Sequence, residues 1–500
     1  MAMRYEHVST SELGWQKAFG ILLSVCALFT ALSFLIYGFG IRSTTLNGGV
    51  ALGFSIALLF ASVRMLTSRG ALAALPYFLI GCAFFYGIGT FVATLIPESM
   101  YKISFTTDVQ RQMLAQVNAV NIAAISIVVL VATPICLSAK LPADSRNDEK
   151  GLNDVVARLE RLMPLLLVLS IPVMVLTWAT FPRPTNPALQ ALLALLSGIP
   201  LFTILLGGAV WTRLIGARKF LIIVLILGLA LYGFLILGKL RTILPIVSFC
   251  IGLWIFKSTR YRAGIIVALT SVIYFLGLAE LVNLSRLHNT YDPLLNSPLQ
   301  RLNILIDTSG NMAELASQHY RGVAAQRFSI APFEAHFISL YDSGSPGDSL
   351  RNFFNVLIPR ILWPDKPIIS PGTEFDLAFR GFVLQSSLAI GFIAEAYWNL
   401  GWTGVFLISG MIGLQMGWFT RRWLLFCQHG LSYAGIFIMA PLVLQQSLWV
   451  ETNIVGGYVG GMVKLMLYVT VIDTILRVYI ARRANEELLR PANKLARLNG

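Results

Sequence analysis

The stretch that decides the fold runs from Arg351 to Trp402 and reads RNFFNVLIPRILWPDKPIISPGTEFDLAFRGFVLQSSLAIGFIAEAYWNLGW. Its charged side chains stand among prolines, aromatic residues and small residues, whereas the chain on both sides consists of long apolar runs. A lipid bilayer excludes such a stretch, because its hydrocarbon core accepts neither scattered charges nor irregular backbone. We therefore expect apolar helices that hold this one polar region at a membrane surface.

The composition is typical of integral membrane proteins. Of the 500 residues, 56% are hydrophobic and 12% are charged, and the mean hydropathy is +0.72. A soluble globular protein carries about 25% charged residues, so this chain has about half the usual charge. The net charge of +14 comes from short basic clusters between apolar runs. That pattern orients a membrane protein and does not indicate a nucleic-acid partner.

Apolar runs of nearly the length that a membrane-spanning helix needs, about 20 residues, occur twelve times in the chain. They lie at 18–41, 46–64, 71–96, 117–138, 162–181, 188–211, 220–237, 242–256, 263–283, 388–420, 431–450 and 459–480. We expect an all-α polytopic membrane protein. Helices one to nine occupy 1–283, a loop with short amphipathic helices occupies 284–387, helices ten to twelve occupy 388–480, and a tail occupies 481–500.

The distribution of Lys and Arg predicts the orientation. With the N-terminus inside, the cytoplasmic segments hold 22 of these residues and the short outside loops hold six. Because positive residues stay on the cytoplasmic side, we expect both termini in the cytoplasm and the 284–387 loop outside. The cytoplasmic segments are then too short for a nucleotide-binding domain, and no Walker-type motif or dinucleotide fingerprint occurs.

The outside loop alternates helical patterns with helix breakers. We expect helices at 311–325, 332–341 and 350–362 that lie on the outer leaflet, a turn at 342–349, and no sheet. The five cysteines lie in or beside apolar segments without metal-ligand spacing. They therefore predict buried uncharged side chains and no metal site.

Three motifs give the chain a family resemblance. They are GKLRTILPI at 238–246, IPRILWPDKPIISPGTEF at 358–375 and SSLAIGFIAEAYWNLGWTGVFL at 386–407. With the late outside loop, they resemble the bacterial O-antigen and exopolysaccharide repeat-unit polymerases (the Wzy type). The first motif departs from the family pattern at Leu240, where a small or polar residue is commoner. The resemblance implies a GT-C-like polymerase–ligase architecture.

The resemblance also implies a reaction at the outer face of a bacterial inner membrane. An undecaprenyl-diphosphate-linked oligosaccharide donates its reducing-end sugar to a hydroxyl of a second lipid-linked repeat unit, and lipid diphosphate leaves. It implies no cofactor and no metal, and it adds a chain-length regulator protein to the expected partners. The transition state is oxocarbenium-like, and the charge that develops on the diphosphate requires fixed cations.

Five basic residues are candidates for holding the diphosphate, since arginine grips phosphate oxygens in a bidentate way. They are Arg241, Arg360, Lys366, Arg351 and Arg380. Arg241 stands at the outer mouth of a short helix, where an interfacial residue that reaches for water is an equal interpretation. Arg360 is fixed by neighbouring prolines, and its alternative is an ion pair with Asp365.

Three acids are candidates for the base that takes the acceptor proton: Glu395, Glu374 and Asp376. Glu395 lies in an otherwise apolar segment, where an acid is costly unless it is paired or used. The alternative for Glu395 is a buried partner of one of the arginines. Trp363 and Trp398 are candidate sugar-stacking platforms or interfacial belt residues.

Other functions compete with the polymerase. An O-antigen ligase shares the donor and the architecture, and the sequence barely separates the two. A lipid-linked-glycan flippase or secondary transporter predicts charges at mid-helix, where the chain offers little besides Lys464. A polyprenyl-phosphate-sugar transferase would carry acids in its first outside loop, and that loop has none.

Overall fold

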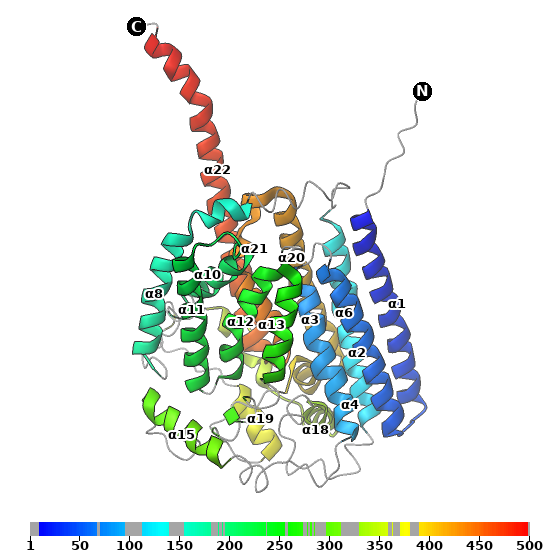
Figure 1. Ribbon diagram of the computed structural model, residues 1–500. Helices are drawn as coiled ribbons and strands as arrows, with labels where there is room; N and C mark the ends of the chain where they lie inside the picture. Colours follow the sequence, from blue (N-terminus) through cyan, green and yellow to red (C-terminus); the bar gives the residue numbers. More distant parts are fainter. Residues whose placement is uncertain are drawn as a thin grey trace, which may run out of the picture.

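Helices form all the regular structure in the described part of the computed structural model (Figure 1). The structure describes residues 10–67, 71–95, 113–139, 155–181, 189, 193, 196–236, 238–255, 259–273, 278, 281–282, 285, 297–311, 330–358, 363, 371–380 and 390–498. Sequences that are apolar on all sides form such buried or membrane-spanning helices, since every backbone group is paired within the helix. The predicted all-α membrane class is confirmed at this level.

Within the described ranges, seven helical segments are long and apolar enough to cross a membrane. They are Trp15–Gly38, Thr44–Leu66, Ala74–Leu95, Leu114–Leu137, Gly216–Leu235, Phe392–Tyr433 and Ile454–Arg482. Four shorter apolar helices accompany them: Met163–Ala179, Gly198–Ala209, Arg241–Trp254 and Gly435–Leu448. The chain is therefore a polytopic helical membrane protein.

The first part of the chain packs its helices side by side (Figure 1). These helices are α1 (Thr10–Gly38), α2 (Thr44–Thr67), α3 (Ala74–Cys82), α4 (Gly89–Leu95), α6 (Leu114–Leu137), α8 (Met163–Ala179), α10 (Gly198–Ala209), α11 (Gly216–Leu235), α12 (Lys239–Trp254) and α13 (Arg260–Ile273). A π-helical segment, η1 (Ala83–Ile88), joins α3 to α4 without leaving the helix.

In the described part of the long loop, three helices and two 3₁₀ turns lie at the end of the bundle opposite to the start of α1 and the end of α22 (Figure 1). They are α15 (Pro298–Gly310), α18 (Ala331–Asp342), η5 (Ser349–Asn352), η6 (Asn355–Leu357) and α19 (Pro371–Arg380). The helix expected at 332–341 and the turn at 342–349 are confirmed. Of the helix expected at 311–325, Asn311 is described and forms the C-cap of α15, and the remainder lies outside the described residues.

The helix expected at 350–362 is wrong in the part that is described. The segment forms the short turns η5 and η6, and Ile358 is already extended, with ψ at 119°. The following residue is Pro359, and proline disfavours a helical conformation in the residue before it. The start of α15 follows from local sequence, because Ser297 at the N-cap and Gln300 three residues later form a reciprocal capping box.

The long helix α20 (Phe392–His429) runs through the centre of the bundle against α6. A bend at Gly401, with φ at 60° and ψ at −144°, separates Phe392–Leu400 from the remainder. That conformation is essentially restricted to glycine, and a Cβ atom at Gly401 would lie 2.7 Å from the Tyr341 ring. The bend thus makes the first nine residues of α20 a separate segment, at the end of the bundle that contacts the loop.

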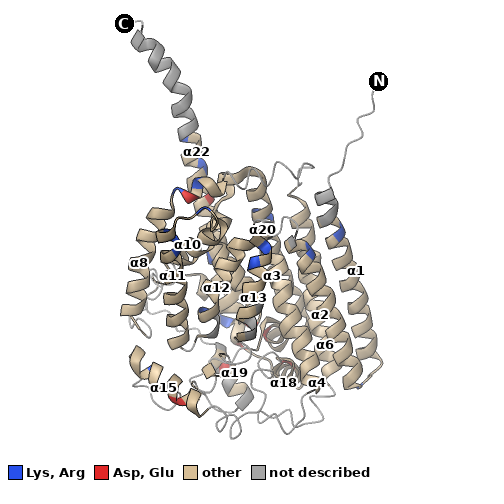
Figure 2. Cartoon of the chain, in the orientation of Figure 1, with Lys and Arg blue, Asp and Glu red and all other residues tan. Residues whose placement is uncertain are grey.

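The C-terminal part completes the bundle. After α20 follow η7 (Gly430–Tyr433), α21 (Gly435–Leu448), the π-helical η8 (Ile454–Met462) and α22 (Val463–Leu498). In η8 a Cβ atom at Gly460 would lie 2.8 Å from Val356, so the glycine-rich GGYVGG sequence allows the loop to pack closely on η8. Most of the Lys and Arg colour lies toward the end where α1 begins and α22 leaves the bundle (Figure 2).

Candidate functional site

Glu395 is the centre of a buried polar network between the loop and the bundle. Its carboxylate is fully buried, and it lies in the first turn of α20, where the helix dipole favours an acid. One oxygen accepts a hydrogen bond from the Ser349 hydroxyl at 2.8 Å. The other accepts from the backbone N–H of Ile454 at 2.6 Å. Both carboxylate oxygens are therefore occupied, and neither bond comes from an arginine.

Asn399 extends this network along the same face of α20. Its amide nitrogen donates to the Ser349 hydroxyl at 2.9 Å and to the Glu395 carbonyl at 2.8 Å. Its amide oxygen accepts from the backbone N–H of Leu350 at 3.3 Å. Three segments that are far apart in sequence, η5, the start of α20 and the start of η8, are thus tied together at Glu395. The contacts fix the loop on the bundle.

A second contact between loop and bundle forms at the C-terminal end of α18. The two carboxylate oxygens of Asp342 accept from the Gln116 amide at 2.8 Å and from the Tyr397 hydroxyl at 3.1 Å. Gln116 lies in α6 and Tyr397 in α20, so one acid joins α6, α18 and α20.

Gly391, with φ at 78°, starts α20 beside Tyr86, whose hydroxyl lies 2.6 Å from where a Cβ atom would stand.

A third buried acid, Glu334, faces α6 from the first turn of α18. Its Oε2 atom accepts from the Asn121 amide at 2.8 Å. Its Oε1 atom and the Asn121 Oδ1 atom are both buried, and neither has a hydrogen-bond partner among the residues that the structure describes. Burial raises the pKa of Glu334 to about 8, although the bond from Asn121 opposes the rise. The side chain is therefore largely protonated at neutral pH.

Glu374 and Arg351 form an ion pair on the solvent side of the Glu395 network. Arg351 bridges Glu374 at 3.4 Å and Asp348 at 3.1 Å, and its side chain is 59% exposed. Burial raises the pKa of Glu374, Arg351 opposes that rise and Asp348 adds to it. Glu374 also lies near enough to interact electrostatically with Glu395. This cluster, Asp348–Arg351–Glu374, puts a cation and two acids within reach of solvent.

Aromatic side chains pack beneath this charged cluster. The ring of Trp398 is 6% exposed and packs against Phe337 and Phe375, with centroids 4.9 and 5.9 Å away. Its ring N–H donates to the Ser345 carbonyl at 3.2 Å. Trp398 therefore packs between the start of α20 and the loop, and its ring face is occupied by protein. Trp363 is half-buried.

The other predicted phosphate ligands are described to different extents. Arg241 is exposed in the first turn of α12, and that end of α12 points toward the loop helices (Figure 1). Asp376 and Arg380 belong to α19, but their side chains are not among those described. Arg360 and Lys366 lie outside the described residues. The structure thus brings Arg351, Glu374 and Glu395 together and places Arg241 at the same end.

Sequence reasoning missed several residues of this region, namely Ser349, Asn399, Asp342, Gln116, Glu334 and Asn121. One signal was available in the apolar run that begins near 117, because Gln116, Asn118 and Asn121 interrupt it within two helical turns. Polar amides in a membrane helix usually mark contacts between helices. For Ser349 and Asn399, the chain offers no pattern that predicts their pairing.

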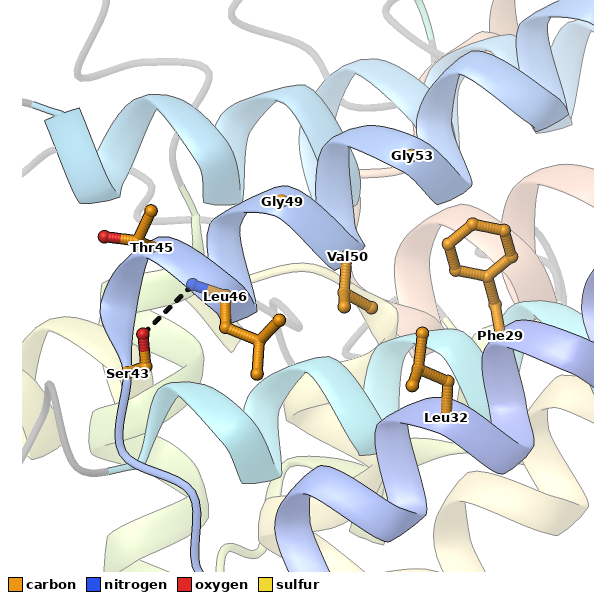
Figure 3. Close-up of a pocket in the computed structure, with 8 residues that line it drawn as sticks. All are labelled: Phe29, Leu32, Ser43, Thr45, Leu46, Gly49, Val50 and Gly53. Carbon is orange, nitrogen blue, oxygen red and sulfur yellow. Dashed lines mark hydrogen bonds between the residues drawn. The ribbon is translucent and has the colours of Figure 1, made fainter.

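A groove of about 530 Å³ between α1 and α2 is a separate feature (Figure 3). Its lining is apolar apart from Ser43 and Thr45, and the Ser43 hydroxyl accepts from the backbone N–H of Leu46 at 3.2 Å. None of its lining residues is ionisable. The groove therefore offers no group for acid–base or electrostatic catalysis.

In comparisons with protein-family models, with curated proteins and with solved structures, this chain matches none of them. Among the side chains that the structure describes, His, Cys, Asp and Glu do not gather in groups of three that could hold a metal ion. The chemistry of the site must therefore be argued from its own residues.

Proposed function

We propose that this protein is an integral-membrane glycosyltransferase that joins undecaprenyl-diphosphate-linked oligosaccharide repeat units into O-antigen or exopolysaccharide chains. The observation that carries the proposal is the attachment of the long loop to one end of the bundle. Glu395, Asp342 and Glu334 each bind bundle and loop together. A rigid polar surface at the mouth of a membrane bundle suits a substrate whose lipid lies in the membrane and whose sugars lie in water.

The proposed topology extends the observed helices. We propose twelve spans, with the four shorter apolar helices and α13 crossing together with the seven longer segments. Both termini would lie in the cytoplasm of a bacterium and the loop would face the periplasm. The support is the concentration of basic residues toward the end that carries the termini (Figure 2).

The proposed reaction assigns a task to each group. The acceptor hydroxyl attacks the anomeric carbon of the donor sugar, the bond from that carbon to the diphosphate oxygen breaks, and the electron pair leaves with lipid diphosphate. Glu374 takes the hydroxyl proton, because its side chain is 31% exposed whereas that of Glu395 is fully buried. Arg351 and Arg241 stabilise the charge on the diphosphate, with Arg360, Lys366 and Arg380 as further candidates.

Glu395 has a positioning role in this proposal. Its two oxygens accept hydrogen bonds from Ser349 and Ile454, and its side chain is buried. Glu395 therefore fixes the position of η5 on the bundle, and with it the position of Arg351. Asp376 remains a candidate for the base because it belongs to the same helix as Glu374. Trp398 supports the loop, and Trp363 remains a candidate sugar platform.

Deletion of the gene in its host tests the function. The polymerase predicts that long glycan chains disappear from gels while single repeat units persist on their lipid carrier or anchor. A ligase would instead leave long chains on the lipid carrier, unattached to their final anchor. A flippase would leave lipid-linked repeat units facing inward.

Complementation with single variants tests the site. We expect Glu374→Gln and Arg241→Ala to lower chain elongation by about 100-fold or more, as loss of a base or of a charge-stabilising group does. Arg262→Gln, an exposed arginine at the opposite end of the bundle, is the matched control and should elongate normally. If Glu374→Gln and Arg241→Ala also elongate normally while they accumulate in the membrane, the site assignment is wrong.

A further inference from the structure

Three arginines lie close together near the end of the bundle where α1 begins and α22 leaves it, and one of them pairs with a buried acid. Arg421 and Arg422 lie in the last third of α20, and Arg477 lies in α22. The acid is Asp473, one turn before Arg477, and its side chain is 2% exposed. Red and blue segments mark the upper part of α22 and its surroundings in Figure 2.

Asp473 is fully engaged by the protein itself. One oxygen pairs with the Arg422 guanidinium at 3.2 Å. The other accepts from the backbone N–H of Gly435 at 2.8 Å, at the start of α21. Asp473 thus compensates one positive charge and joins α20, the start of α21 and α22.

Aromatic rings hold two of the arginines in place. The Arg422 guanidinium lies 4.8 Å from the centre of the Trp418 ring and 5.5 Å from that of Tyr433. Arg477 lies 4.2 Å from the Tyr433 ring and donates from Nε to the Ser432 carbonyl at 3.0 Å. Such stacking orders a guanidinium and leaves its outer N–H groups available.

The cluster carries more positive than negative charge. Arg421 and Arg477 both lie close enough to Arg422 to repel its charge. The Nε atom of Arg421 is buried and has no hydrogen-bond partner in the described part of the chain. In the same part of the chain, Asp473 is the only acid paired with these three arginines. A buried N–H group and two uncompensated charges are both satisfied by a bound anion.

The surroundings of the cluster identify the kind of anion. Val478, the residue after Arg477 in α22, is 64% exposed, and Ile475, on another face of the same turn, is 61% exposed, as side chains that face lipid would be. Trp418 and Tyr433 are the residue types that sit at the level of lipid headgroups. An anion that reaches the arginines along this apolar surface is attached to a hydrocarbon chain. A phosphate supplied from water would have no need of it.

We propose that Arg421, Arg422 and Arg477 bind the phosphate of an anionic phospholipid in the membrane leaflet next to the chain termini. The inference does not depend on the proposed glycosyltransferase activity, because it concerns the opposite end of the bundle and is tested by binding. Bound lipid would stabilise the junction between α20, α21 and α22, since it contacts the folded chain only.

The experiment titrates purified full-length protein in zwitterionic detergent with phosphatidylglycerol and follows the thermal unfolding midpoint. Phosphatidylcholine with the same acyl chains and inorganic phosphate at the same concentrations are parallel titrations. An arginine that contacts the lipid phosphate contributes enough to change lipid affinity roughly fivefold. We expect Arg477→Gln to raise about fivefold the phosphatidylglycerol concentration that gives half of the shift in the midpoint. The Arg421→Gln, Arg477→Gln double variant should raise that concentration about 30-fold.

The control is Arg262→Gln, which removes an exposed arginine from the first turn of α13 at the same end of the bundle. It should keep the response of the unaltered protein. If the double variant does not fold, the single Arg477→Gln variant, altered at an exposed side chain, decides the matter. The proposal is overturned if Arg477→Gln responds like the unaltered protein, if the control loses as much, or if inorganic phosphate reproduces the effect.

Discussion

Glu334→Gln should stabilise this protein at neutral and alkaline pH. Within the described part of the native protein, Glu334 Oε1 and Asn121 Oδ1 are both buried and have no hydrogen-bond partner, and both are acceptors while Glu334 is ionised. A proton on Oε1 turns it into a donor, so the protonated acid can bind the amide of Asn121 through two hydrogen bonds. Glutamine has the same shape and carries N–H groups at every pH, so it imitates the protonated acid.

The size of the effect follows from the pKa of Glu334, which is about 8 in the folded protein and 4.5 without burial. Each pH unit between these values changes the free energy of unfolding by about 1.4 kcal/mol. Because the folded pKa is the higher one, the contribution of Glu334 to stability is fully present below the unfolded pKa. It is lost as the pH rises toward the folded pKa. Glutamine should therefore gain about 3 kcal/mol at pH 7 and about 5 kcal/mol above pH 8.

Unfolding curves of both proteins in the same detergent, at a series of pH values from 4.5 to 9, measure this difference. His336, on the same helix, contributes with the opposite sign, because burial lowers its pKa, and its effect cancels between variant and parent. Glu374→Gln is the matched control, since that acid lies in the same loop and is part-exposed. It should change the pH dependence far less.

Two results would refute the reasoning about Glu334. One is a difference between variant and parent that stays constant across the pH series, which would mean that Glu334 does not change its protonation on unfolding. The other is a Glu334→Gln variant that is less stable than the parent above pH 8, which would mean that the ionised acid has a partner of its own.

Two further predictions concern the attachment of the loop. Ser349→Ala removes the hydroxyl that pairs with a Glu395 oxygen and an Asn399 N–H, both of which are buried. It should therefore lower the free energy of unfolding by about 2–4 kcal/mol and speed proteolysis of the loop. Ser343→Ala, at an exposed hydroxyl, should change neither. Gly401→Ala forces a Cβ atom against Tyr341 at a backbone conformation restricted to glycine and should lower the unfolding midpoint by the equivalent of at least about 2 kcal/mol. Gly410→Ala, on the same helix with open space around it, should leave that midpoint unchanged or raise it, and equal effects at both glycines would contradict the role given to the bend.

The apolar runs predicted the helical membrane class and the α18 helix because local pattern decides both. Long runs without charge can only form helices in lipid, and Phe333 and Phe337 on one side of 332–341 mark a buried helical face. The helix predicted over 350–362 is wrong because the restriction that Pro359 places on Ile358 outweighs the amphipathic spacing. The start of α15 is a local feature as well, since Ser297 and Gln300 form its capping box.

The candidate site was predicted only in part. Glu395 stood out because an acid in an apolar segment is costly, and the structure does bury and pair it. Its partners, the Ser349 hydroxyl and the Ile454 N–H, lie 46 and 59 residues away. Partners at such separations follow from the way the loop folds back on the bundle, and no local spacing encodes them.

By itself, the sequence determined that the chain crosses a membrane as helices and that its one long polar region must stay outside the lipid. The reason is the high cost of leaving charges and backbone groups without water or partners. Only the tertiary structure decided which acid is enclosed and which is open. Glu395 and Glu374 are the same residue type in successive helices of the chain. They differ because η5 and η8 cover Glu395, whereas α19 leaves Glu374 near solvent.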